Sequence, residues 1–167
     1  MGLDDPVIEI AITPNRGDCL GVRGIARDLA ALGLGTLKPL DTGPIKGVFD
    51  SPIKIQMDLH DQYVDACPQF VGRYFRGVKN AASPKWMQDR LLAVGLRPIS
   101  ALVDITNLMT IEHCRPLHVF DADKLHGDIH VRMAKQSEKI TGIDGKEYNL
   151  DPEMTVIADE KSAGSIA

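Results

Sequence analysis

Short stretches of alternating apolar and polar residues recur along the chain, and this alternation is typical of half-buried β-strands. The clearest example is residues 53–59, where every second position is Ile, Met or Leu. Asp144-Gly145 gives the strongest hairpin signal, because strand patterns flank it on both sides. The segments that we predict to be strands are residues 7–12, 53–59, 70–78, 129–133, 139–143, 147–150 and 155–158.

Apolar residues spaced three and four apart predict a helix from Val22 to Leu32, which Gly33 ends. The turn that precedes it, Asn15-Arg16-Gly17-Asp18, is open to two interpretations. In the structural one, which we favour, Asp18 caps the helix and Arg16 bonds nearby carbonyl groups. In the other, the turn is a binding site.

Two further helices follow in the middle of the chain. Ser83-Pro84 predicts the start of one, with a hydroxyl cap and proline at the first helical position, and Gly95 ends it. Ser100 begins the other, whose apolar pattern runs through Leu102, Ile105 and Met109. Because strands and helices do not alternate regularly, the pattern predicts an α+β fold with mostly antiparallel strands.

Composition narrows the class of protein. The chain has 167 residues, of which 44% are hydrophobic and 25% charged, as in an ordinary globular protein. We predict one domain over residues 1–167, with a connector near residues 36–52 that is rich in Pro and Gly. No apolar run is long enough to span a bilayer and no secretory signal is visible, so we expect a cytoplasmic protein without membrane contact.

Cysteine count and net charge exclude some kinds of site. Three cysteines without a paired spacing argue against a disulfide framework or a zinc site. The formal net charge is −4 and no basic stripe is visible, so any affinity for RNA should come mainly from other parts of a larger assembly. No phosphate-binding loop is present, and His113 and His118 are spaced unfavourably for a metal pair.

The candidate chemistry lies in two nearby segments, Val103-Asp104-Ile105-Thr106-Asn107 and Arg115-Pro116-Leu117-His118-Val119-Phe120-Asp121. Thr106 and Asn107 stand inside an apolar helical pattern that favours neither. His118 lies among apolar residues, which disfavour its charged form. Taken singly, His118 fits a hydrogen-bonded core residue and Asn107 a capping residue. Together they form a polar cluster that can surround the amino and carbonyl groups of a ligand.

Those segments also resemble a known family. Residues 12–20 (ITPNRGDCL), 24–28 (GIARD), 103–107 (VDITN), 116–121 (PLHVFD), 131–134 (VRMA) and 156–159 (VIAD) resemble, in the same order, the central domain of the bacterial phenylalanyl-tRNA synthetase β-subunit. The resemblance covers essentially the whole chain. It departs at Leu108, Cys114-Arg115 and Val119, where the family more often has Tyr, Gly-Gln and Ala, and these changes are expected to tune a pocket.

The resemblance implies a layered sandwich of mostly antiparallel sheets with flanking helices. It also implies an editing site that removes wrongly attached tyrosine from tRNA(Phe). Thr106, Asn107 and His118 would be the catalytic residues, and Pro116 would join them in binding the substrate. The family continues past the position of Ala167 into a glycine-rich segment and a glutamate that recognises the tyrosine hydroxyl. The expectation is therefore an incomplete editing domain.

The resemblance further implies tRNA(Phe) and a synthetase α-subunit as partners, in an assembly of two α and two β chains. No cofactor is expected in this chain, whereas the parent enzyme would use ATP and Mg²⁺ to attach phenylalanine to tRNA. Two alternatives stay open: a non-catalytic scaffold or tRNA-contacting module of the synthetase, and a stand-alone enzyme on a related sandwich.

Overall fold

The computed structural model describes residues 6–142 and 144–166, and it divides into two compact units. The helical unit is made of Met1–Pro44 and Val78–Val119, and the sheet unit of Ile45–Gly77 and Phe120–Ala167. The chain first passes between the units at Pro44, in a segment without helix or strand that includes residues 36–52. Among the described residues, no helix is long and apolar enough to cross a membrane.

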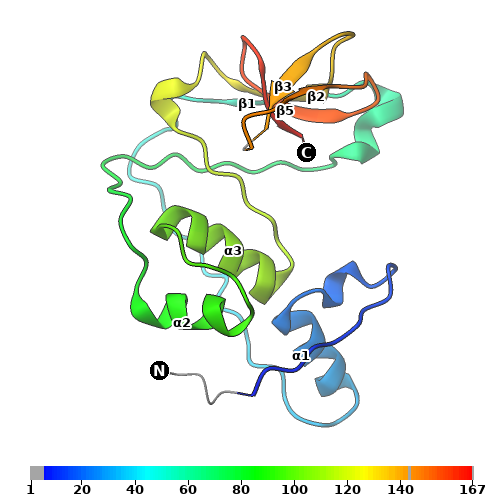
Figure 1. Cartoon of the computed structure of the whole chain (residues 1–167), viewed down its shortest axis with the longest axis vertical. Helices are drawn as coiled ribbons and strands as arrows, with labels where there is room; N and C mark the ends of the chain where they lie inside the picture. The colour runs from blue at the N-terminus through cyan, green and yellow to red at the C-terminus, as the bar shows by residue number, and fades with distance from the viewer. Residues whose placement is uncertain (1–5, 143, 167) are drawn as a thin grey trace. The chain divides into compact units, whose positions relative to one another are not determined.

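The helical unit contains the short 3-10 helix η1 (Gly17–Cys19) and the helices α1 (Val22–Ala31), α2 (Lys85–Ala93) and α3 (Ala101–His113) (Figure 1). Helices α2 and α3 pack against each other around a small core. Met87, Leu91 and Leu108 are its buried side chains, and Ile111 packs against them. Burial of this apolar area is the main force that holds the two short helices together.

Glycines end the first two helices as the sequence predicts. Gly33 and Gly95 follow α1 and α2 with φ of 76° and 81°, a left-handed conformation that side chains with a Cβ rarely adopt. Both predicted caps are wrong. The N-cap of α1 is Gly21 and that of α2 is Pro84, and neither helix has a side-chain cap.

The predicted burial is wrong in part as well. In α3 the buried residues are Asp104 and Leu108, whereas Ile105 is 42% exposed. The predicted strand over residues 7–12 is also absent, because this segment pairs with no other strand, and Val7 and Ile8 are exposed.

The sheet unit contains a four-stranded sheet with the order β1-β2-β5-β6. Its strands are β1 (Ile55–Asp58), β2 (Ile129–Met133), β5 (Thr155–Ala158) and β6 (Ala163–Ile166). β1 and β2 are parallel, and the other two pairs are antiparallel. In the β2–β5 pair, Val131 lies opposite Ile157, and both side chains are buried.

The second sheet is the hairpin of β3 (Lys139–Thr141) and β4 (Glu147–Asn149). Its turn contains Gly145 with φ of 76°, which confirms the hairpin predicted from Asp144-Gly145. Ile143, at the end of the predicted strand, lies outside the described residues. Ile140 of β3 packs against a core that includes Val156 of β5 and Ala163 of β6, so the two sheets share one small core.

The predicted α+β class with mostly antiparallel pairing is confirmed. Three features of the sheet unit differ from the prediction. Residues 70–78 form no strand, and the 3-10 helices η2 (Asp61–Ala66) and η3 (Ala122–Lys124) were not expected. β6 was not expected either, because Ala, Gly and Ser favour strands poorly and only pairing with β5 makes this segment a strand.

Candidate functional site

Thr106 and Asn107 occupy successive positions on α3, and both are half-buried. The Thr106 hydroxyl donates a hydrogen bond to the backbone carbonyl of Val103, with 2.7 Å between the oxygens. This bond uses the single proton of the hydroxyl and leaves its oxygen able to accept. The carbonyl of Thr106 in turn accepts from the Thr110 hydroxyl at 3.0 Å.

The first turn of α3 is fixed by the segment before α2. The backbone amide of Ala101 donates to the carbonyl of Ala81 at 2.7 Å, and the amide of Leu102 donates to Oδ1 of Asn80 at 3.2 Å. These contacts satisfy amides at the helix start that have no partner within the helix. The start of the helix that carries Thr106 and Asn107 is therefore fixed by contacts outside that helix.

Asp104 adds a buried contact at the same place. Its side chain is fully buried, and its carboxylate accepts hydrogen bonds from the Ser83 hydroxyl and, at 2.8 Å, from the Ile99 amide. The Ser83 bond, followed by the Ile99 bond, holds the pKa of Asp104 below its ordinary value against the effect of burial. Asp104 lies in the predicted motif, but the sequence did not show that Ser83 was its partner.

Pro116 and His118 lie in the loop that follows α3, and both are exposed. The helix ends at His113, and its C-cap Cys114 adopts the left-handed conformation with φ of 54°. The Cys114 thiol donates to the backbone carbonyl of Asp18 at 3.3 Å, which ties the end of α3 to η1. All four predicted site residues thus belong to the helical unit, and their convergence on a ligand stays a prediction.

A cavity of about 190 Å³ lies in the sheet unit. It contains none of the four predicted residues, and Phe120, Leu125 and Ile157 supply much of its apolar wall. Asp159 is one of its lining residues. Burial opposes ionisation of this carboxylate, but backbone amides of His126, Ser162 and Lys161 hold its pKa at about 2. Because these donors already bind both oxygens, Asp159 supports the loop between β5 and β6.

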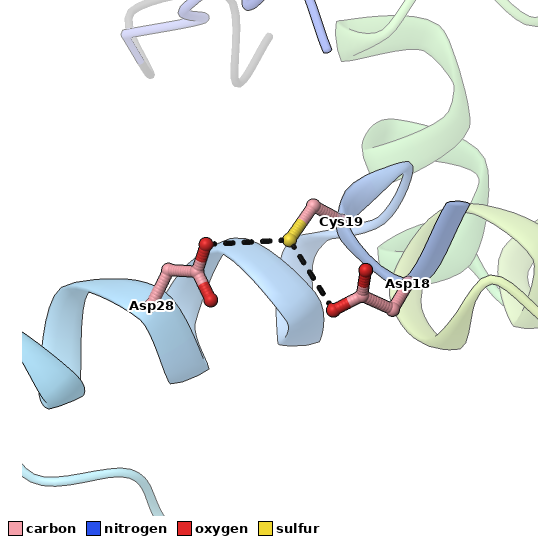
Figure 2. Close-up of side chains that lie close together, drawn as sticks. All are labelled: Asp18, Cys19 and Asp28. Carbon is pink, nitrogen blue, oxygen red and sulfur yellow. Dashed lines mark hydrogen bonds between the residues drawn. The ribbon is translucent and has the colours of Figure 1, made fainter. Parts of the chain in front are cut away.

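A compact charged cluster joins η1 to α1, as Figure 2 shows for Asp18, Cys19 and Asp28. Their ligand atoms lie within 4.8 Å of one another, which is close enough to hold a metal ion. Arg16 lies among them, however, at 2.9 Å from Asp18, 2.7 Å from the Cys19 sulfur and 2.8 Å from Asp28. Arg27 also pairs with Asp18.

Arg16 and Arg27 thus balance the charges of the two carboxylates. The hydrogen bond from Arg16 is the main reason that the pKa values of Asp18 and Asp28 lie below their ordinary range. Burial raises the pKa of the Cys19 thiol, so this sulfur is a neutral donor and a poor metal ligand. The cluster is a structural junction. Asp18 was predicted to cap the helix and Arg16 to bond carbonyl groups. Instead, Arg16 bonds the Asp18 and Asp28 carboxylates, and the N-cap of α1 is Gly21.

Comparison with known proteins gives the family. The sequence family called the B3/4 domain matches residues 66–167, which is more than half of the chain. The chain belongs to the B3/4 domain family. The B3/4 match includes Thr106, Asn107, Pro116 and His118.

Relatives of this B3/4 chain carry the name phenylalanine–tRNA ligase beta subunit. The relative from Paramagnetospirillum magneticum is 58% identical over 163 residues, which cover 98% of this chain and 20% of the relative. The relative from Ruegeria pomeroyi is 59% identical over 163 residues, with the same coverage. That from Brucella abortus is 56% identical over 167 residues, or 100% of this chain and 21% of the relative. The chain therefore spans about a fifth of the length of these relatives.

Proposed function

We propose that this chain is part of a phenylalanine–tRNA ligase β subunit and carries residues that hydrolyse tyrosine from mischarged tRNA(Phe). The observation that supports this best is the B3/4 match over residues 66–167, together with 56–59% identity to three proteins named as that subunit. The parent enzyme would attach phenylalanine to tRNA in the cytoplasm, with ATP and Mg²⁺ bound outside this chain. Its partners would be tRNA(Phe) and an α-subunit, in an assembly of two α and two β chains.

A second, hydrolytic site follows from the chemistry of the two amino acids. Tyrosine differs from phenylalanine by one hydroxyl, and an apolar pocket rejects such an analogue only about a hundredfold. A site with a buried polar group that pairs with the tyrosine hydroxyl favours tyrosine over phenylalanine. Bound phenylalanine would leave that polar group unpaired, at a cost of about 1–3 kcal/mol. A ligase for phenylalanine therefore gains accuracy from a site that accepts tyrosine and hydrolyses its ester.

The candidate residues have side chains suited to that reaction. With its proton bonded to Val103, the Thr106 oxygen accepts a hydrogen bond from the ammonium group of the aminoacyl ester. The Asn107 amide donates to the ester carbonyl, where negative charge develops as water attacks. His118 positions the water, and Pro116 contacts the amino acid. An aminoacyl ester is already activated, so placement of water and stabilisation of the oxyanion suffice without a strong nucleophile.

The test uses the assembled ligase that contains this chain and follows the loss of tyrosine from tyrosyl-tRNA(Phe). His118→Ala and Asn107→Ala should each lower the rate at least tenfold, in line with the loss of one positioned group. His60→Ala is the matched control, because His60 is an exposed histidine of the sheet unit. Charging with phenylalanine should be unchanged in all three variants. Hydrolysis at the wild-type rate in the first two would refute the site assignment.

The alternative is a scaffold or tRNA-contacting module without chemistry in this chain. Titration of tyrosine into the 167-residue chain, followed by NMR of the backbone amides, distinguishes it from the proposal. Shifts concentrated at Thr106, Asn107 and His118 favour a pocket that accepts the amino acid. Shifts that avoid these residues favour the scaffold.

A further inference from the structure

Two separate segments of the sheet unit are joined by a group of aromatic and basic side chains. Phe49 and Tyr74 meet edge to face, with 6.2 Å between the ring centroids. The guanidinium of Arg76 lies 4.3 Å from the Phe49 ring centroid and 5.8 Å from that of Tyr74. Arg73 donates a hydrogen bond to the carbonyl of Ile45. These contacts hold residues 45–49 against residues 73–76 although neither segment is a helix or strand.

We call this group the basic aromatic surface. It consists of Lys46, Phe49, Arg73, Tyr74, Phe75 and Arg76. Lys46, Arg73 and Arg76 are exposed, and none of them makes an ion pair with another described residue. By contrast, Arg16, Arg27, Arg90 and Arg132 are each paired with a carboxylate. The charges of Lys46, Arg73 and Arg76 are therefore not balanced by a carboxylate of the described residues.

Phe75 supplies an exposed aromatic residue in the same segment as Arg73 and Arg76. Its side chain is 67% exposed and stands in the chain between Tyr74 and Arg76, both of which contact Phe49. An exposed aromatic ring in a segment that also carries cations suits single-stranded nucleic acid, because bases stack on the ring and phosphates pair with the cations. An acidic peptide would use the charges and leave the ring unused.

The charge pattern of the sequence supports a polyanion as partner. From Ala66 to Gly77 the sheet unit contains Arg73 and Arg76 and no acidic residue, although the net charge of the whole chain is −4. No basic stripe is visible in the sequence because Lys46 lies far from Arg73 along the chain, and the fold brings their segments together. A local concentration of one sign in an acidic chain draws a polyanion to that surface.

We propose that the basic aromatic surface binds single-stranded RNA through stacking on Phe75 and through phosphate contacts with Lys46, Arg73 and Arg76. The choice of RNA over an anionic membrane rests on the proposed function, in which the substrate is an amino acid attached to RNA. The proposal goes beyond that function because it assigns RNA binding to residues outside the predicted hydrolytic site.

The test measures binding of a fluorescent, non-acylated 12-nucleotide RNA of mixed sequence to the full chain by anisotropy at several salt concentrations. Three phosphate contacts predict a slope of log K against log salt of about −2, at about −0.7 per contact. Arg73→Gln with Arg76→Gln should reduce the slope to about −0.7. Phe75→Leu, which keeps an apolar side chain but removes the ring, should weaken binding about tenfold.

The matched control is Lys38→Gln with Arg97→Gln, which removes the same charge from exposed positions of the helical unit and should leave the slope unchanged. Equal effects of the two double variants would show that only net charge matters and would overturn the proposal. Two other results would also overturn it: equally tight binding of an acidic peptide of matched charge, or binding to phosphatidylserine vesicles in preference to RNA.

The RNA probe carries no ester, so its binding does not depend on hydrolysis. Hydrolysis of tyrosyl-adenosine, an ester without the rest of the tRNA, reports on the hydrolytic site alone. The surface variants should leave this rate unchanged in the assembled ligase. If the surface variants lose RNA binding but hydrolyse the ester normally, RNA binding by the surface is supported and is shown to be separate from the hydrolytic site. Normal RNA binding in the surface variants refutes the surface and leaves the proposed function standing.

Discussion

The hydroxyl of Ser83 donates a hydrogen bond to the buried carboxylate of Asp104, and this bond ties the start of α2 to the first turn of α3. Ser83 is 5% exposed and Asp104 is fully buried, so water cannot replace either partner. Since Thr106 and Asn107 follow Asp104 on the same helix, the bond also fixes the position of two predicted site residues.

Removal of this bond should destabilise the chain. Ser83→Ala leaves the Asp104 carboxylate with one donor fewer in a dry environment, and we expect the free energy of unfolding to fall by about 1–3 kcal/mol. Urea denaturation measures the change. Ser162→Ala is the control, since that serine is exposed in the sheet unit. Equal unfolding midpoints for the two variants would contradict a stabilising role for the Ser83–Asp104 bond.

A methyl group on Gly24 should separate η1 from α1. A Cβ at this position would lie 1.8 Å from the carbonyl oxygen of Asp18 and 2.8 Å from the Cα of Cys19, and neither backbone atom can move cheaply. Gly24→Ala should therefore lower the free energy of unfolding by about 3 kcal/mol. At Gly35 no atom lies within 4 Å of the same methyl group, so Gly35→Ala is a matched control.

Thermal unfolding of the two glycine variants gives the answer. The melting temperature of Gly24→Ala should fall by several degrees, whereas that of Gly35→Ala should stay close to the wild-type value. If both variants melt at the wild-type temperature, the close packing of α1 on η1 does not exist in solution.

The ion pair of Arg132 and Glu138 should make stability depend on pH. Two hydrogen bonds of 2.8 and 2.6 Å join the guanidinium to the carboxylate, and both side chains are less than 15% exposed. The hydrogen bond from Arg132 lowers the pKa of Glu138 from 4.5 to about 2, and the backbone amide of Lys135 contributes to this shift. Burial acts in the opposite direction. Glu138 therefore stabilises the fold fully above pH 4.5, and this contribution disappears as the pH falls toward 2.

Glu138→Gln should remove that contribution. The lowered pKa corresponds to about 3 kcal/mol at pH 7, so the variant should be less stable than wild type by up to that amount at neutral pH. Near pH 2 the two should converge. Glu153→Gln, at an exposed glutamate, should keep the wild-type dependence. A constant difference between Glu138→Gln and wild type from pH 7 to pH 2 would show that the carboxylate charge is not involved.

Local signals in the sequence predicted most elements of the fold. The ends of α1 and α2 followed from Gly33 and Gly95, because a left-handed residue needs no partner elsewhere in the chain. Short strand-like runs separated by turn signals predicted β2 and β5, which pair with each other in the centre of their sheet. Residues 70–78 show the limit of this signal. Their pattern is that of a strand, but a strand exists only where another backbone supplies hydrogen bonds, and none does so here.

The sequence supplies a list of candidate site residues, which stays a prediction, but it does not supply their contacts. The motif around Thr106 and Asn107 is local, whereas the partner of Asp104 is 21 residues away, where Ser83 resembled a helix cap. The basic aromatic surface could not be predicted from the sequence either, because the contacts of Phe49 with Tyr74 and Arg76 join segments that are distant in the chain. Charge and propensity are properties of single residues, but contacts depend on the fold.

The most direct test of the central claim compares two substrates of the assembled ligase that contains this chain. The rates of hydrolysis of tyrosyl-tRNA(Phe) and phenylalanyl-tRNA(Phe) should be measured side by side. An editing site that pairs with the tyrosine hydroxyl should release tyrosine about 5- to 160-fold faster, since an unpaired buried group costs about 1–3 kcal/mol. His118→Ala should lower the rate of tyrosyl-tRNA(Phe) hydrolysis at least tenfold, because the water that attacks the ester is then no longer positioned. Equal rates for the two esters in the wild-type enzyme would contradict an editing role for this chain.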